Sequence, residues 1–430
     1  GSEAEVAHHA AGLQRETDVR IAAPDDVLRW ARSNDLVIFF SEHFQRFRRT
    51  WHELNRRGCN TLYAIDGILE WRNAWENRDD EPASPWTMRP VLCDKVACIG
   101  SSQVRVLNQW GNAGKTELVG LPRLDDFPKA NKTPVDKKQP FRLLVTTAKW
   151  PGFTPEQTEL VERSLQDLRG YLDATPEIGG RSIEVVWRLT GGLDERVGVV
   201  NQLNDVSGQE LRNVLADVDA VITTPSTVML EAMLGELPVC LLDYTNSPRY
   251  VDAAWSISAE SHFAEVLPQM ADPAPRRLMY QRALLEDALQ ATESASQRMA
   301  ELAYEMIRIG HDCRAANRPV RFPAQILPPI AAEPLINPAL LYPDRPELTT
   351  EHNVAEANAL VGDSWRKIEE LEARIALLEY ELERAAEGFE KIAAHPVVAP
   401  LLKVRSVAAR MGGHIAAVLS PRKPESETAN

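Results

Sequence analysis

The sequence lacks a long hydrophobic run and an excess of positive charge, and each absence excludes a class of protein. No apolar stretch in its 430 residues approaches the roughly 20 residues that span a bilayer. The formal net charge of -14 leaves no general basic surface for phosphate backbones, which argues against a nucleic-acid-binding protein. We therefore expect a soluble, cytoplasmic protein whose only membrane contact would be peripheral, at the inner face.

Cysteine is also scarce, with five residues scattered along the chain. An odd and dispersed set does not indicate a disulfide framework. Cys93 and Cys98 are separated by four residues, but no second pair accompanies them, so zinc is not expected. Asp217 and Asp219 have the spacing of a metal pair but fall at the start of a predicted strand. The sequence predicts reduced thiols, no metal and no cofactor.

Apolar runs alternate with amphipathic stretches over most of the chain, which is the pattern of repeated βα winding around parallel sheets. The Gly1-Ser2 start is typical of an expression scar, so the first predicted α/β domain begins at residue 3 and ends at 127. Residues 128–140, rich in Lys and Pro, are the predicted hinge. A second α/β domain is expected over residues 141–318.

Residues 215–244, LADVDAVITTPSTVMLEAMLGELPVCLLDY, carry the clearest chemical pattern. A β-branched run at residues 218–222 predicts a strand buried on both faces, and residues 228–234 predict a helix. Between them lies a turn rich in hydroxyl groups. Ligands bind beyond the carboxyl ends of parallel strands, where a helix start also attracts phosphate. The alternative is an ordinary α/β corner in which Ser226 or Thr227 only caps the helix.

The sequence of residues 216–243 resembles the nucleotide-binding segment of GT-B glycosyltransferases. It also resembles that of their relatives, the UDP-N-acetylglucosamine 2-epimerases and the wall-polymer glycerophosphotransferases. In that family the Ser/Thr pair contacts donor phosphate and the helix Glu contacts the ribose. The resemblance implies phosphate contacts for Ser226 and Thr227, with Thr224 in the same turn, and a ribose contact for Glu231.

Two further stretches support the same resemblance. VGLPRLD, at residues 119–125, resembles the end of the N-terminal domain in that family. Some relatives carry Arg-His-Pro at a strand end where this chain has Arg188-Leu189-Thr190, so the Arg matches and the His-Pro does not. The implied fold is α/β, with two Rossmann-like parallel-sheet domains facing a cleft. The donor nucleotide would lie on the second domain, and the acceptor would enter from the first.

Sugar transfer in such a cleft requires positive charge for the departing phosphate and a base for the acceptor. Arg188 or Lys149 could supply the charge. Asp66 ends a predicted strand and precedes Gly67, so it is the first candidate for the base, or for the nucleophile of a retaining enzyme. His43 and Glu42 are the second choice. The alternative for Asp66 is a simple Asp-Gly turn.

The C-terminal residues have a different pattern. Residues 319–353 are rich in proline and predict an extended linker. Within residues 354–393, apolar side chains recur at alternating spacings of three and four, which predicts a coiled coil and a parallel homodimer; the alternative is a helix laid on the globular body. Residues 394–430 are a predicted tail, in which residues 397–419 could form an amphipathic helix on anionic lipid or a partner.

The function predicted first is transfer of a sugar from a nucleotide-sugar donor to a glycan or glycolipid acceptor, in bacterial surface polysaccharide assembly. The second is a sugar-nucleotide epimerase or hydrolase on the same fold. A third treats the chain as a coiled-coil scaffold without catalysis.

Overall fold

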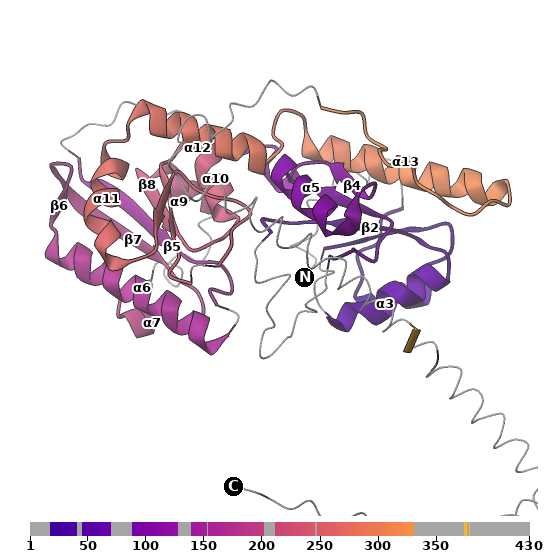
Figure 1. Cartoon of the computed structure of the whole chain (residues 1–430), viewed down its shortest axis with the longest axis horizontal. Coiled ribbons are helices and arrows are strands. Elements are labelled where there is room, and N and C mark those ends of the chain that lie inside the picture. The colour runs from indigo at the N-terminus through magenta and orange to yellow at the C-terminus, as the bar shows by residue number, and fades with distance from the viewer. Residues whose placement is uncertain are drawn as a thin grey trace, which may run out of the picture. The chain divides into compact units, whose positions relative to one another are not determined.

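The computed structural model describes residues 18–40, 45–69, 88–127, 139–152, 154–201, 211–245, 247–330, 374–375 and 378. The chain divides into two units, Gly1–Trp365 and Arg366–Asn430. Both sheets lie in the first unit (Figure 1). None of the described helices is long and apolar enough to cross a membrane.

The first sheet is parallel and has the strand order β1-β2-β3-β4. Its strands are β1 (Leu36–Phe39), β2 (Asn60–Ala64), β3 (Lys95–Cys98) and β4 (Thr116–Leu118). The helical segments of this part are α2 (Pro24–Trp30), α3 (Gln45–Arg56), α5 (Ser101–Leu107), η1 (Asn108–Asn112) and η2 (Pro122–Leu124). One face of the sheet packs on Trp51 of α3 and Leu107 of α5.

The other face of the first sheet is covered by a helix from much later in the chain. Met299, Leu302 and Met306 of α13 (Ala295–Ala315) pack on Leu62 and Ala97. Figure 1 shows α13 beside β2 and β4 of this sheet. The domain boundaries predicted from the sequence, 141–318 for the second domain, include α13 in that domain. It packs on the first sheet because a parallel sheet of apolar strands must be covered on both faces.

The second sheet has six strands in the order β10-β9-β8-β5-β7-β6, all parallel except for the antiparallel pair of β6 and β7. The strands are β5 (Phe141–Thr146), β6 (Glu177–Ile178), β7 (Arg181–Arg188), β8 (Ala220–Thr223), β9 (Val239–Leu242) and β10 (Trp255–Ile257).

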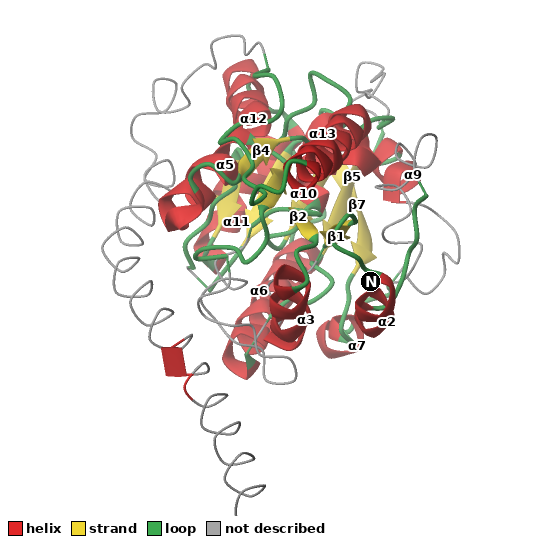
Figure 2. Ribbon diagram, turned by 90° about the vertical axis from the view of Figure 1, so that its right-hand side faces the viewer, coloured by secondary structure: helices red, strands yellow, loops and turns green. Residues whose placement is uncertain are grey.

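Successive residues of the central strands face opposite sides, and each side is covered by helices. Leu143 and Val145 pack toward α6 (Pro155–Ala174), α7 (Leu193–Val197) and α11 (Phe263–Ala271), the last of which follows η3 (Glu260–His262). Leu144 packs toward α9 (Leu211–Ala216), α10 (Val228–Leu234) and the end of α12 (Pro275–Ala288). Figure 2 shows the strands of both sheets between helices, with α12 and α13 above them and α3 and α6 below.

Two predictions for the C-terminal third meet the structure only in part. Residues 319–330 belong to the predicted linker, yet Leu327 lies in the core of the first sheet and Phe322 and Ile326 pack beside it, so this piece is not merely extended. In the predicted coiled coil, the described residues 374–375 and 378 are helical, and Ile375 and Leu378 are 54% and 55% exposed. The rest of the seam and the tail lie outside the described residues, so the coiled coil stays a prediction.

Candidate functional site

The carboxyl ends of β5, β7 and β8 are joined by hydroxyl groups. The Thr224 hydroxyl accepts a hydrogen bond from the backbone N–H of Ala148 at 2.8 Å. Thr147 and Thr190 have their hydroxyls 2.9 Å apart, and the Thr146 hydroxyl donates to the Arg188 carbonyl at 3.1 Å. These bonds fix the loops that leave three adjacent strands. Thr224 is thus placed at the predicted edge, but its hydroxyl holds a loop in position.

The turn after β8 forms as the sequence predicts. Ser226 is 8% exposed, and its hydroxyl accepts a hydrogen bond from the backbone N–H of Val228 at 3.2 Å. Thr227 is the residue that precedes α10, but its side chain makes no capping hydrogen bond. Ser226 therefore satisfies a backbone donor at the start of α10.

Arg188, the last residue of β7, reaches the same edge with an unused donor. Within the part of the chain that the structure describes, its buried Nη1 has no hydrogen-bond partner. Burial lowers the pKa of the Arg188 guanidinium, although an arginine stays charged at neutral pH. An unpaired, partly desolvated cation is unfavourable until an anion approaches it. Arg188 is therefore a candidate for an anion contact at this edge.

Thr227 faces the first sheet. Its hydroxyl accepts a hydrogen bond from the backbone N–H of Ile68 at 3.2 Å. The carbonyl of Gly67, in the same turn after β2, accepts a hydrogen bond from Gln103 Nε2 at 3.1 Å. The turn that carries Asp66 is thereby held against the start of α10.

Asp66 and Glu231 meet at one guanidinium. Arg123, in η2, donates through Nη1 to Glu231 Oε1, and its Nε lies 3.8 Å from Asp66 Oδ1. The Glu231 side chain is only 8% exposed, whereas those of Asp66 and Arg123 are 36% and 30% exposed. The structure thus brings the predicted base and the predicted ribose ligand together through a residue to which the sequence analysis gave no role.

The signal for Arg123 was present in the VGLPRLD stretch, which runs from the core of the first sheet, at Val119, into the core of the second. Leu121 and Leu124 lie in the core under α10. Asp125 accepts hydrogen bonds from the backbone N–H groups of Ala295 and Ser296, at 2.7 and 2.8 Å, at the start of α13. Arg123 is the member whose charged group reaches the candidate site.

The remaining predicted residues are placed differently. Lys149 is exposed on the loop after β5. Glu42 and His43 lie outside the described residues. Asp219 accepts hydrogen bonds from the Arg142 backbone at 2.9 Å and from Arg181 at 2.7 Å, before β8 begins. Among the described residues, no group of three or more His, Cys, Asp or Glu could hold a metal ion.

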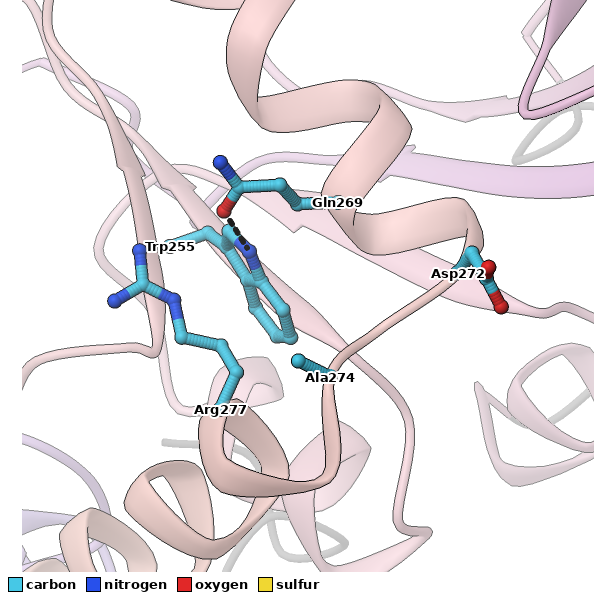
Figure 3. A pocket seen from close by; sticks show the side chains of 5 residues that line it. All are labelled: Trp255, Gln269, Asp272, Ala274 and Arg277. Carbon is cyan, nitrogen blue, oxygen red and sulfur yellow. Dashed lines mark hydrogen bonds between the residues drawn. The ribbon is translucent and has the colours of Figure 1, made fainter.

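A pocket on the second sheet lies away from this site. It is lined by Trp255, Gln269, Asp272, Ala274 and Arg277 (Figure 3). Trp255 begins β10, so the pocket stands at the opposite end of that strand from the carboxyl edge. The Arg277 guanidinium lies 5.6 Å from the centre of the Trp255 ring, and the indole N–H donates to Gln269 Oε1 at 3.3 Å. The Trp255 ring is thus covered and its donor is satisfied.

Comparisons with known proteins give matches to solved structures alone. No protein-family model matches the chain, and no curated protein matches it. The wall teichoic acid polymerase TagF, soaked with CDPG, is 12% identical, with a TM-score of 0.41 over 64% of this chain and 72% of that chain. MnaA from S. aureus, solved with UDP, is 11% identical, with a TM-score of 0.43 over 74% and 96%.

A protein from Listeria monocytogenes described as a UDP-N-acetylglucosamine 2-epimerase is 13% identical, with a TM-score of 0.39 over 71% of this chain and 84% of that chain.

Proposed function

We propose that this chain is a glycosyltransferase that moves a sugar from a nucleotide-activated donor to a glycan or glycolipid acceptor, in bacterial surface polysaccharide assembly. The observation that carries the proposal is Arg188, a partly buried cation whose Nη1 has no partner among the described residues. It ends β7 two residues before Thr190, whose hydroxyl lies 2.9 Å from that of Thr147. A diphosphate supplies the acceptor atoms that this edge lacks.

The diphosphate and the ribose of the donor would contact different residues of this edge. Its diphosphate would take hydrogen bonds from Arg188 and the Ser226 hydroxyl, and the exposed Lys149 could add charge as the phosphate departs. Glu231 accepts from Arg123 through Oε1, and its Oε2 has no hydrogen-bond partner within the described ranges. A carboxylate oxygen in that state is suited to the vicinal hydroxyls of a ribose.

Asp66 is the proposed general base. It follows the second strand of the first sheet, next to the turn that contacts Thr227, and its side chain is 36% exposed. An acceptor hydroxyl that enters beside the first sheet would therefore meet a carboxylate close to the donor. Replacing Asp66 with Asn should abolish transfer and leave folding unchanged, as judged by circular dichroism. Near-normal turnover of this variant would remove Asp66 from the mechanism.

The anion position can be tested without knowing the sugar. We expect UDP, CDP or GDP to bind the wild-type protein in isothermal titration calorimetry, and Arg188→Gln to weaken that binding about tenfold or more, since hydrogen bonds to charged groups contribute about 1.5 to 3 kcal/mol. Arg163→Gln is the matched control, because it removes the same charge from an α6 side chain that is 72% exposed. Equal affinities of the two variants would contradict the assignment.

A sugar-nucleotide epimerase or hydrolase is the second candidate, and one observation favours it. Asp66 approaches the same guanidinium as Glu231, so an acid/base group stands near the proposed donor position, where it could act on the donor sugar itself. The two functions are separated by incubating the protein with UDP-, GDP-, CMP- and dTDP-sugars, with and without acceptor glycan. Nucleotide release that depends on acceptor supports transfer, whereas release or isomerisation without acceptor supports the second function.

Self-association through residues 354–393 is part of the proposal, since Ile375 and Leu378 expose more than half of their surface. Replacing both with Asp should convert the dimer into a monomer in sedimentation equilibrium. A scaffold without catalysis would dimerise in the same way but would bind no nucleotide.

A further inference from the structure

We propose that Arg123 is a positioning residue that makes nucleotide binding on the second sheet depend on the first sheet. The inference rests on the proposed function, since it concerns the same nucleotide. Arg123 belongs to η2, which follows the last strand of the first sheet, whereas Glu231 belongs to α10 on the second. The proposed ribose ligand is therefore held by a group from outside its own sheet.

The contact fixes which oxygen of Glu231 remains for a ligand. Arg123 Nη1 donates to Oε1, which leaves Oε2. The Glu231 side chain is only 8% exposed, so without a neighbouring cation its carboxylate would be poorly solvated and would turn away. With Arg123 present, the carboxylate keeps one orientation. A ribose then meets a fixed, charged acceptor.

Arg123 is itself held in place from the first sheet. Its Nε lies 3.8 Å from Asp66 Oδ1, so one guanidinium faces two carboxylates. Pro122 fixes the backbone before it, and Leu124 after it is buried in the core. The guanidinium thus has a defined position before any ligand binds, which lowers the entropic cost of ordering the site.

A second ion pair joins the same two parts of the chain. It allows a test of whether Arg123 positions Glu231 or only holds the two parts together. Arg105 of α5 donates to both carboxylate oxygens of Asp287 in α12, at 2.8 and 2.7 Å. Neither residue contacts Asp66, Thr227 or Glu231 through any of these bonds. Removing Arg105 therefore breaks an ion pair between the parts without touching the proposed ribose ligand, which makes Arg105→Gln the matched control.

The experiment measures nucleotide affinity rather than turnover. UDP and 2′,3′-dideoxyuridine diphosphate are titrated into the full chain and its variants by calorimetry, with CDP and GDP and their dideoxy forms used instead if the wild type prefers those bases. We expect Arg123→Gln to weaken binding of the ribonucleotide tenfold or more and Arg105→Gln to change it less than twofold. Arg123→Lys, which keeps the charge, should recover part of the loss.

Two comparisons show whether Arg123 acts through Glu231. In the Glu231→Gln background, Arg123→Gln should change affinity less than twofold. The dideoxy nucleotide, which lacks both hydroxyls, should also bind the wild type and Arg123→Gln within twofold of each other. An equal loss for both nucleotides, or an undiminished loss in the Glu231→Gln background, would overturn the positioning role.

The failure of this inference differs from the failure of the proposed function. If the wild type binds the ribonucleotide and Arg123→Gln binds it equally well, the role of Arg123 is wrong and the nucleotide site stands. If the wild type binds none of these nucleotides, the proposed function is wrong, and the role of Arg123 is rejected with it. Far-ultraviolet circular dichroism and thermal unfolding of each variant exclude misfolding as the cause of a loss.

Discussion

Gly67 lies so close to Thr227 that a Cβ atom added to it would stand 2.4 Å from the Thr227 hydroxyl oxygen. That oxygen accepts the hydrogen bond from the next backbone N–H, that of Ile68. The turn after β2 and the start of α10 are thus in contact without room for a methyl group. Glycine is required here by a close approach between segments that are distant in sequence.

Replacing Gly67 with Ala should separate these segments. We expect a loss of about 1 to 3 kcal/mol in the free energy of unfolding, as for other overpacked positions. Adding Thr227→Ala removes the hydroxyl and leaves the Cβ of residue 227 at 3.6 Å, an ordinary contact, so the double variant should recover part of the loss. Urea unfolding of both single variants and the double variant measures the coupling.

Gly170 provides the control for that experiment. It lies inside α6, and a Cβ added there would meet nothing within 4 Å. Gly170→Ala should therefore be neutral or should stabilise the protein by up to about 1 kcal/mol, the helix preference of alanine over glycine. Equal losses from the two Gly→Ala changes would show that the contact with Thr227 does not matter.

The buried ion pair of Lys95 and Glu117 should make a large contribution to stability when only one partner is removed. Their charged groups are 2.7 Å apart, and the side chains are 0% and 2% exposed. Lys95→Met leaves an uncompensated buried carboxylate, so we expect a loss of about 3 to 5 kcal/mol. The Lys95→Met, Glu117→Met double variant should lose less than the sum of the single changes. Additive losses in urea unfolding would contradict this coupling.

The architecture of the second sheet could be predicted from sequence because its signals are local. A β-branched run, a turn with serine and threonine and a short apolar helix succeed one another, and α10 spans Val228–Leu234 as the pattern predicts. The place of α13 could not be predicted in this way. Its amphipathic stripe shows that one face is buried, but periodicity does not say which of two similar sheets buries it.

Glu53 should make the stability of the protein depend on acid pH. Arg56, and then Arg57, hold the pKa of the Glu53 carboxyl at about 2, below its ordinary value of 4.5. A carboxyl whose folded-state pKa is depressed stabilises the fold above its unfolded pKa and loses that contribution as the pH falls through the folded pKa. Glu53→Gln should therefore be less stable than wild type at pH 6, and the difference should shrink between about pH 4.5 and pH 2.

Urea unfolding at several pH values measures that difference. Arg56→Gln removes the first partner and should reduce the pH-dependent part of the effect. A gap between wild type and Glu53→Gln that stays constant down to pH 2 would mean that the carboxyl titrates alike in the folded and unfolded states.

One of the five thiols should react much faster than the others. All five cysteines are free, and four are buried, whereas Cys313 is half-exposed near the end of α13. Burial raises the pKa values of Cys98 and Cys59, which keeps these thiols protonated and unreactive. A disulfide reagent at pH 8 should label Cys313 first and the rest upon unfolding. Cys313→Ser should remove the fast phase; a fast phase of two or more thiols would contradict this assignment.

The sequence predicted those parts of the candidate site that depend on a single strand-turn-helix segment, and not the contacts between distant segments. Ser226 and Arg188 are found at the carboxyl edge, as the strand pattern requires. The use of the Thr224 hydroxyl by the Ala148 N–H, and of the Thr227 hydroxyl by the Ile68 N–H, depends on loops that the sequence does not place. The role of Arg123 was not predicted for the same reason, because its partners are distant in sequence. Asp66 lies 57 positions before it and Glu231 lies 108 positions after it.

The return of α13 to the first sheet has a consequence for synthesis of the protein. Strands β1 to β4 leave the ribosome first, but the residues that cover one of their faces, Met299, Leu302, Met306 and Leu327, follow only after the whole second sheet. During that interval Leu62, Ala64 and Ala97 present an uncovered apolar face, the kind of surface that aggregates or binds chaperones. A message cut short anywhere before the codon for Leu327 therefore damages the earliest part of the fold as well as the latest.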